Sequence, residues 1–263
     1  MPDSTTSLPA ASQVPEINDM DMGDIGAALR AGWHDFRRAP AMGLFFALIY
    51  VLGGWALYFF LVVTDQIWWA IPLTVGFPLA APFLAVGLYE VSHRLEQDRP
   101  YTIGDILGVV WQQRLRQLPL MSWVIIVYFL FWSFFAHMLF ALFMGPSVLM
   151  NVSTSYAYLF QPEGLMMLLV GTAFGAVFAL VLFCLTVISL PLLLDKELDF
   201  VTAMLTSFAT VRRNPRVMLV WGVVIAGLTF AALLPGFLGL FVVLPVLGHA
   251  SWHIYRRALR DTP

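Results

Sequence analysis

Long runs of apolar residues alternate along the chain with short segments that carry most of the charge. A helix needs about 20 apolar residues to cross a hydrocarbon core of about 30 Å. Six runs satisfy this length, and they lie at about residues 41–63, 67–89, 118–144, 164–194, 217–234 and 236–255. The pattern therefore predicts an all-α membrane protein with six transmembrane helices.

Prolines modify two parts of this prediction. The second run contains Pro72, Pro78 and Pro82. Proline removes a backbone donor and clashes with the preceding turn, so we expect this span to be kinked or broken. The fifth and sixth runs are separated only by Pro235 and Gly236, which predicts a tight helical hairpin.

The composition agrees with a membrane protein and excludes several other classes. Hydrophobic residues make up 60% of the chain and charged residues 11%, whereas a soluble domain carries roughly 25% charged residues. A soluble enzyme and a disordered protein are therefore excluded. The single cysteine, Cys184, excludes an internal disulfide, and a net charge of −2 gives no reason to expect nucleic acid as a partner.

The basic residues predict the orientation of the chain. All 14 Lys and Arg residues lie before the first run, between the second and third, between the fourth and fifth, or after the sixth. Basic residues are enriched in cytoplasmic loops. Both termini and the long loops are therefore predicted to be cytoplasmic.

Three of the basic segments share one apolar spacing. Residues at i, i+4, i+8 and i+11 form a stripe along an α-helix. The three stripes are Ile25, Leu29, Trp33 and Phe36; Leu107, Trp111, Leu115 and Leu118; and Phe200, Met204, Phe208 and Val211. We interpret the fold as three pseudo-repeated hairpins, each preceded by an amphipathic interfacial helix. The alternative is that any re-entry into the membrane produces such a pattern.

The domain organisation follows from the same pattern. Residues 1–21 are rich in Ser, Pro, Ala and Asp and contain no basic residue, which predicts a disordered cytoplasmic tail. Residues 22–260 are predicted to form a single six-helix transmembrane domain. Its repeat units are expected at about 22–98, 99–195 and 196–260.

The basic ends of the amphipathic segments are candidate contacts for anionic lipids or for a partner subunit. A basic residue near an anionic surface contributes about 1 kcal/mol to membrane binding. The candidates are Arg37, Arg38, Arg114, Arg116, Arg212 and Arg213. The alternative, compatible with the first, is that these segments are elbow helices that pack under the bundle while their arginines set the topology.

Three histidines are candidate metal or haem ligands. His137 lies in the middle of the third run, and His249 and His253 are four residues apart and so share a helix face. Imidazole binds several transition metals, but two histidines without a third ligand do not make a site. Packing and a place at the interface are the simpler interpretations. The chain contains no Walker loop and no Gly-x-Gly-x-x-Gly, His-Glu-x-x-His or Gly-x-Ser-x-Gly sequence, so we expect neither catalysis nor a bound cofactor.

Three stretches resemble a known family: residues 28–36, 87–90 and 208–215. They are similar to a bacterial family of predicted integral membrane proteins of unknown function, sometimes labelled cytochrome c oxidase subunit I-like. The resemblance covers about residues 20–260. The resemblance implies at most an association with a respiratory complex. A true oxidase subunit I is similar to a twelve-helix bundle with several intramembrane histidines, whereas this chain has six predicted spans and one clear intramembrane histidine, His137.

The predicted function is that of a non-catalytic accessory or assembly protein of the bacterial inner membrane. Its expected partners are the lipid bilayer, anionic lipids and respiratory-complex subunits, with no nucleic acid. One alternative is a small-molecule or lipid transporter, which the repeats and the proline-rich second run suggest. The other is a haem- or copper-handling protein that uses His137 or the pair His249 and His253.

Overall fold

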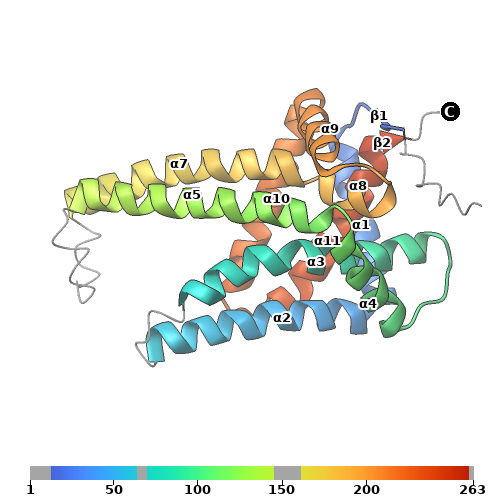
Figure 1. Ribbon diagram of the computed structural model, residues 1–263, viewed down its shortest axis with the longest axis horizontal. Coiled ribbons are helices and arrows are strands. Elements are labelled where there is room, and N and C mark those ends of the chain that lie inside the picture. The colour runs from blue at the N-terminus through green and yellow to red at the C-terminus, as the bar shows by residue number, and fades with distance from the viewer. Residues whose placement is uncertain (1–12, 64–69, 145–160, 261–263) are drawn as a thin grey trace, which may run out of the picture. The chain divides into compact units, whose positions relative to one another are not determined.

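The computed structural model of the protein describes residues 13–63, 70–144 and 161–260. These residues form two compact units. Unit 1 combines Met1–Ser122 with Cys184–Pro263, and unit 2 is Trp123–Phe183. Figure 1 shows that helices make up nearly all of the described chain.

The elements follow one another as short and long helices framed by two short strands. In chain order they are β1 (Glu16–Ile17), α1 (Met22–Arg38), α2 (Pro40–Tyr58), the π-helix η1 (Phe59–Val63), α3 (Ala70–Glu96), α4 (Ile103–Gln112), the 3₁₀-helix η3 (Gln113–Leu115), α5 (Leu118–Met144), α7 (Pro162–Thr186), α8 (Ser189–Asp195), α9 (Phe200–Arg213), α10 (Pro215–Leu233), α11 (Leu240–Ala258) and β2 (Leu259–Arg260).

Four segments of the described residues are long and apolar enough to cross a membrane. They are Pro40–Tyr58, Leu118–Phe143, Pro162–Asp195 and Pro215–Leu233. The chain is therefore a multi-pass, all-helical membrane protein, as the sequence predicts. Within the described residues, α3 and α11 are not among these candidate spans, so the second and sixth spans and the threefold repeat remain predictions.

The short helices before α2 and α10 begin and end for the same chemical reasons. Asp21 caps α1 in a capping box with Asp24, and Asp199 caps α9 by accepting from a backbone N–H. A capping side chain satisfies N–H groups that have no partner within the helix. The following helices start with Pro40 and Pro215, which fit the first turn because proline needs no donor there.

Each predicted apolar stripe buries only one of its four residues, namely Ile25, Leu118 and Val211. In α1 the buried residues are Ile25, Ala28, Gly32 and Asp35, and in α9 they are Ala203, Thr206, Ser207, Thr210 and Val211. The large stripe residues Trp33, Trp111 and Phe208 are 46%, 64% and 48% exposed. The helices α1 and α9 therefore dock mainly through small and polar residues, which allow closer approach, and leave much of each stripe exposed on the surface of unit 1.

Helix α11 is the central helix of unit 1 and packs against α1, α2, α3 and α10. Its closest neighbour is α1, which crosses it at Gly32. A Cβ atom at Gly32 would lie 2.6 Å from the Ala250 nitrogen and 2.7 Å from the Val246 oxygen. Both are backbone atoms, so only glycine permits this helix–helix distance.

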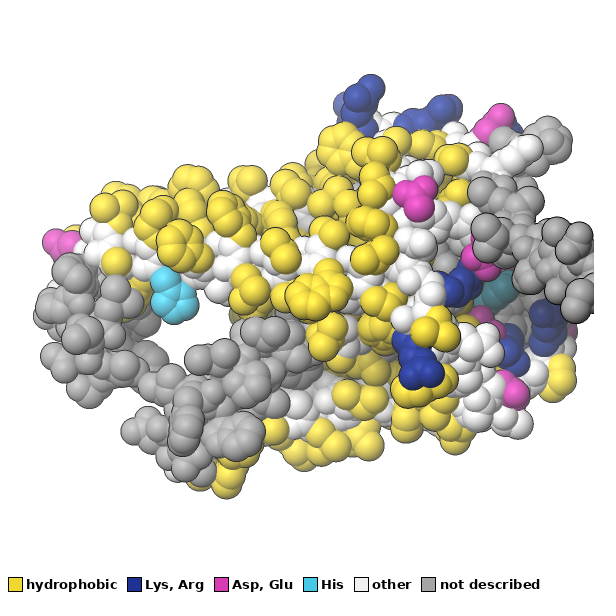
Figure 2. All heavy atoms as spheres, in the orientation of Figure 1, with side chains coloured by type: hydrophobic (Ala, Val, Ile, Leu, Met, Phe, Trp, Pro, Cys, Tyr) yellow, Lys and Arg dark blue, Asp and Glu magenta, His cyan; other side chains and the backbone are white. Residues whose placement is uncertain are grey.

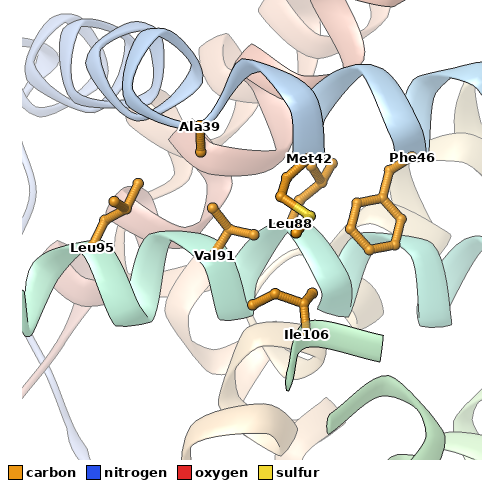
Figure 3. Packing of buried hydrophobic residues seen from close by; sticks show 7 residues of the cluster. All are labelled: Ala39, Met42, Phe46, Leu88, Val91, Leu95 and Ile106. Atoms are coloured by element: carbon orange, nitrogen blue, oxygen red, sulfur yellow. The ribbon is translucent and has the colours of Figure 1, made fainter. Parts of the chain in front are cut away.

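An apolar cluster joins α2, α3 and α4 (Figure 3). Its buried members are Ala39, Met42, Phe46, Leu88, Val91, Leu95 and Ile106. Gly87 makes room for the ring of Phe46, because a Cβ atom there would overlap that ring. The cluster fixes α4 against α3 through Ile106, which is fully buried.

The predicted fourth span is interrupted near its C-terminal end. Helix α7 ends at Thr186 and α8 begins at Ser189. Pro191 lacks an N–H and its ring clashes with the carbonyl four residues earlier, which explains the break. Ser207 of α9 covers it: its hydroxyl accepts from the Ile188 N–H at 3.1 Å and donates to the Cys184 oxygen at 2.7 Å.

Two other predictions about spans need correction. The second span is kinked or broken in the prediction, and a break is excluded because α3 is continuous from Ala70 to Glu96; a kink at Pro78 or Pro82 stays a prediction. Pro72 lies in the first turn, where its missing N–H is not needed. The connection between α10 and α11 is longer than Pro235 and Gly236 alone, because a turn extends to Gly239 and α11 begins at Leu240.

The predicted disordered tail over residues 1–21 is wrong from Gln13 onward, and residues 1–12 lie outside the described residues. Strand β1 pairs antiparallel with β2, so that Glu16 faces Arg260. The side chain of Asn214 accepts from the Met20 N–H at 2.8 Å and donates to the Asn18 carbonyl at 2.9 Å. The strand pairing and the two hydrogen bonds of Asn214 fix the position of residues 16–20. The composition of the segment gives no sign of these contacts.

Candidate functional site

A cluster of four polar side chains lies buried between α1, α3 and α11, and we call it the polar cluster. It consists of Asp35, Ser92, His249 and His253. Nε2 of His253 donates to the Asp35 carboxylate at 2.7 Å, and Ser92 Oγ shares a hydrogen bond of 2.8 Å with Nδ1 of His249. Ser92 and His249 are fully buried, and Asp35 is 6% exposed.

The electrostatics of the polar cluster favour an ionised carboxylate. Burial raises the pKa of Asp35, but hydrogen bonds from His253 and Ser92 lower it by more, so the pKa stays below its ordinary value. Asp35 therefore carries a charge at neutral pH and accepts a hydrogen bond from His253. Nε2 of His249 has no hydrogen-bond partner among the described residues, so one polar atom of the cluster is unsatisfied.

A second group of polar side chains lies near the C-terminal ends of α3, α8 and α11, and we call it the charged ring. It consists of Glu90, His93, Arg94, Asp195, Tyr255 and Arg256. Glu90 pairs with Arg94 at 2.5 Å, and Asp195 accepts from the Tyr255 hydroxyl at 2.6 Å. Arg256 lies 3.8 Å from Asp195. Burial raises the pKa of Glu90, but hydrogen bonds from His93 and Arg94 bring it below its ordinary value. Figure 2 shows Lys, Arg, Asp and Glu side chains gathered toward the end of unit 1 that carries β1 and β2.

Unit 2 is different in chemistry, because α5 and α7 pack through aromatic rings. The ring centroid of Phe178 lies 4.9 Å from that of Trp132 and 5.7 Å from that of Phe135. The Tyr128 hydroxyl donates to the Phe178 carbonyl at 2.8 Å. Ring pairs at such distances add to the packing of two helices.

Beside this aromatic contact, α5 and α7 form an apolar groove of about 580 Å³, which we call the hairpin groove. Its lining residues are Trp132, Ala136, Leu139, Phe140, Met167, Leu168, Gly171, Thr172, Gly175, Ala176 and Ala179. A Cβ atom at Gly171 would meet nothing within 4 Å, whereas one at Gly175 would touch Trp132. The groove is therefore open along part of its small-residue side, where another helix could approach closely.

The structure separates the candidate metal ligands into two environments. His249 and His253 belong to the polar cluster, where each has a protein partner. His137 is exposed on α5, and its Nδ1 lies 2.7 Å from the Ser133 carbonyl oxygen. Within residues 13–63, 70–144 and 161–260, no three His, Cys, Asp or Glu side chains form a group that could hold a metal ion. Metal binding by these histidines stays a prediction.

The six candidate arginines also differ from one another. Arg38 pairs with Asp98 at 3.4 Å, Arg213 with Asp19 at 2.7 Å, and Arg116 with Glu197. Arg114 lies 3.6 Å from the centroid of the Trp111 ring. Arg37 and Arg212 are exposed. Three of the candidates thus already use an acidic partner within the chain.

Sequence reasoning did not identify Asp35 or Ser92 as site residues. A signal for Asp35 was present, since Ala28, Gly32 and Asp35 have the spacing i, i+4 and i+7 of one helix face. The larger side chains of the neighbouring stripe obscured that face. Ser92 gives no comparable signal, because a single serine near the end of a span is common.

Comparison with known proteins agrees with the predicted class. Residues 70–195, from the start of α3 to the end of α8, match a family described as predicted integral membrane protein (DUF2189). Of the three stretches that carry the resemblance, residues 87–90 lie within this match. No curated protein and no solved structure matches the chain. Over residues 70–195, therefore, the chain carries the sequence pattern of the DUF2189 family of predicted integral membrane proteins, whose function is unknown.

Proposed function

We propose that the protein is a non-catalytic accessory or assembly subunit of a bacterial inner-membrane complex. In this proposal the hairpin groove receives a transmembrane helix of the partner. The observation that carries it is the open small-residue side of the groove at Gly171, on a hairpin whose lining is almost wholly apolar. A respiratory oxidase is the complex that the family resemblance suggests.

The physics of helix association in lipid supports this use of the groove. Lipid tails are as apolar as the helices, so association depends on close van der Waals packing rather than on the hydrophobic effect. Small residues such as Gly171 and Ala179 let two backbones approach, and Trp132 and Phe140 offer large rings beside them. The groove has the shape and chemistry that a partner helix requires.

The proposal includes six spans with both termini in the cytoplasm. The location of all 14 basic residues outside unit 2 supports this orientation. We further propose that residues 22–260 act as one transmembrane domain with repeat units at about 22–98, 99–195 and 196–260. The matching caps and proline boundaries of α1–α2 and α9–α10 support the repeat.

The test is mass spectrometry of what co-purifies with the tagged full chain, extracted from its native membrane in a mild detergent. We expect a stoichiometric membrane partner with the wild type and at least a roughly tenfold loss of it with Gly171→Leu, which fills the groove. Gly227→Leu on α10 is the matched control, since a Cβ atom there also meets nothing within 4 Å. It should leave the partner bound.

Two results would overturn the proposal. One is a wild-type protein that leaves the membrane alone. The other is equal retention of the partner by Gly171→Leu and the wild type. Copper or haem in the purified protein, lost in His137→Ala or His249→Ala, would favour the metal-handling alternative instead.

A further inference from the structure

A second apolar groove, independent of the hairpin groove, lies entirely within unit 1 between α3 and α4. We call it the α4 groove. Its volume is about 730 Å³, and it is lined by Phe83, Leu107, Gly108, Val110, Trp111 and Arg114. Five of these residues are apolar, and the only charged side chain is that of Arg114.

The groove exists because of how α4 is attached to α3. Thr102 and Asp105 form a capping box that starts α4, and the fully buried Ile106 fixes it against α3. Leu107, next along the helix, is 39% exposed. A Cβ atom at Gly108 would meet nothing within 4 Å, so the groove is open at this point.

The charge at the groove is not neutralised by an acidic side chain. The guanidinium of Arg114 lies 3.6 Å from the centroid of the Trp111 ring, and no ion pair joins Arg114 to an acidic residue among the described residues. Arg116, two residues further on, pairs with Glu197. Trp111 is 64% exposed and Leu115 is 81% exposed, so large apolar side chains surround an available positive charge.

We propose that the α4 groove binds one anionic phospholipid. Its acyl chain lies along Phe83, Leu107 and Val110, and its phosphate contacts Arg114. Tryptophan is enriched at membrane interfaces, where its ring lies at the level of the headgroups. Arginine is well suited to phosphate, because its planar guanidinium donates several N–H groups in a fixed geometry.

The apolar lining distinguishes a lipid from a free anion. A phosphate ion would use Arg114 alone and leave the rest of the groove empty. A phospholipid contacts both Arg114 and the apolar lining of the groove. Negative charge and an acyl chain are therefore both required of the ligand.

The test uses delipidated full-length protein and native mass spectrometry with added lipid. Phosphatidylglycerol and phosphatidylcholine of the same chain length are compared, and inorganic phosphate is added as a competitor. We expect phosphatidylglycerol to bind about tenfold more tightly, a difference of about 1.4 kcal/mol. Inorganic phosphate at millimolar concentration should not displace it.

Two variants and one control locate the site. Arg114→Gln should abolish the preference for phosphatidylglycerol, and Gly108→Leu should weaken binding of both lipids by filling the groove. Arg216→Gln, which removes an exposed arginine of α10, should leave the preference unchanged. Equal binding of the two lipids by the wild type, equal effects of Arg114→Gln and Arg216→Gln, or displacement by phosphate would each overturn the proposal.

Discussion

The two units of the molecule differ in the contacts that hold their helices together. Unit 1 contains every Lys and Arg residue and adds to its apolar packing the polar cluster, the charged ring and the pairing of β1 with β2. Unit 2 contains one charged residue, Glu163, and joins α5 to α7 through the rings around Phe178. Directional polar contacts specify one arrangement, whereas ring packing leaves a broad apolar surface.

The exposed surfaces of the two units show the consequence. In unit 2, Phe131, Phe134 and Leu169 are 59%, 69% and 68% exposed. In unit 1, Trp221 and Trp252 are fully buried. Large apolar side chains on the outside of a membrane hairpin face lipid or a partner helix. Unit 1 also exposes large side chains such as Phe230 and Leu234, but unlike the described part of unit 2 it encloses a core of fully buried large side chains.

The strongest test of the internal structure of unit 1 is Gly32→Leu. The new side chain would overlap backbone atoms of α11 at Val246 and Ala250, which cannot move without separating the helices. We expect the free energy of unfolding to fall by about 3 kcal/mol, the upper part of the usual range for overpacking. Thermal and denaturant unfolding of the detergent-solubilised protein would measure this loss.

Gly26→Leu is the matched control on the same helix. The nearest atom to a Cβ there is Nη1 of the Arg30 side chain, at 3.4 Å, which can move away. Replacing a helical glycine is then expected to stabilise the protein by up to about 1 kcal/mol. If Gly32→Leu were as stable as Gly26→Leu, the packing of α1 on α11 would be disproved.

The polar cluster predicts a pH dependence of stability. The pKa of Asp35 is below its ordinary value in the folded protein, so the carboxylate stabilises the fold above its unfolded pKa. That contribution is lost as the pH falls through the lower, folded pKa. The contribution of Asp35 to the midpoint of thermal unfolding in detergent should therefore stay level from about pH 7 to pH 5 and be lost below about pH 4.

The variant Asp35→Asn tests whether Asp35 causes this loss of stability at low pH, which we call the acid limb. It should lower the midpoint at pH 7 by removing a buried charged hydrogen bond, a loss of about 2 kcal/mol, and should make the acid limb shallower. Asp98→Asn is the control, because the side chain of Asp98 is 86% exposed. An acid limb of unchanged depth in Asp35→Asn would show that other carboxylates, such as Glu90, cause it.

Unit 2 should tolerate the loss of a central side chain better than unit 1. Phe178→Ala removes the ring that contacts Tyr128, Trp132 and Phe135. We expect a loss of about 1–2 kcal/mol in bicelles, below the 3–5 kcal/mol typical of a soluble core, because lipid tails replace the lost apolar contacts. Phe134→Ala, at a 69% exposed position, should have almost no effect.

The sequence predicted the spans better than the faces of the short helices. The predicted span 118–144 coincides with α5, because an uninterrupted apolar run permits little else in a bilayer. The break after Thr186 was missed, since the effect of Pro191 on the preceding turn depends on the rescue by Ser207 of α9. That contact joins residues 19 positions apart and leaves no local pattern.

The candidate sites show the same difference between residues with a local sequence signal and residues placed by distant contacts. His249 and His253 were found because their spacing of four residues is a local feature. Their partners Ser92 and Asp35 were not, because the pairing of α11 with α1 joins residues 218 positions apart. Apolar stripes suggested which face of α1 would dock, but in a membrane large apolar residues are equally stable facing lipid. Small residues such as Gly32 are the better indicator of docking.

The smallest effect is expected at the paired strands near the ends of the chain. Arg260 contacts Glu16 at 2.6 Å, but the side chains are 67% and 49% exposed. An exposed pair contributes at most about 1 kcal/mol and is weakened by salt. Arg260→Gln should therefore lower the unfolding free energy by less than this, with the difference disappearing in about 1 M salt. A loss comparable to that of Gly32→Leu would mean that the strand pairing, rather than the contact of α1 with α11, fixes the structure of unit 1.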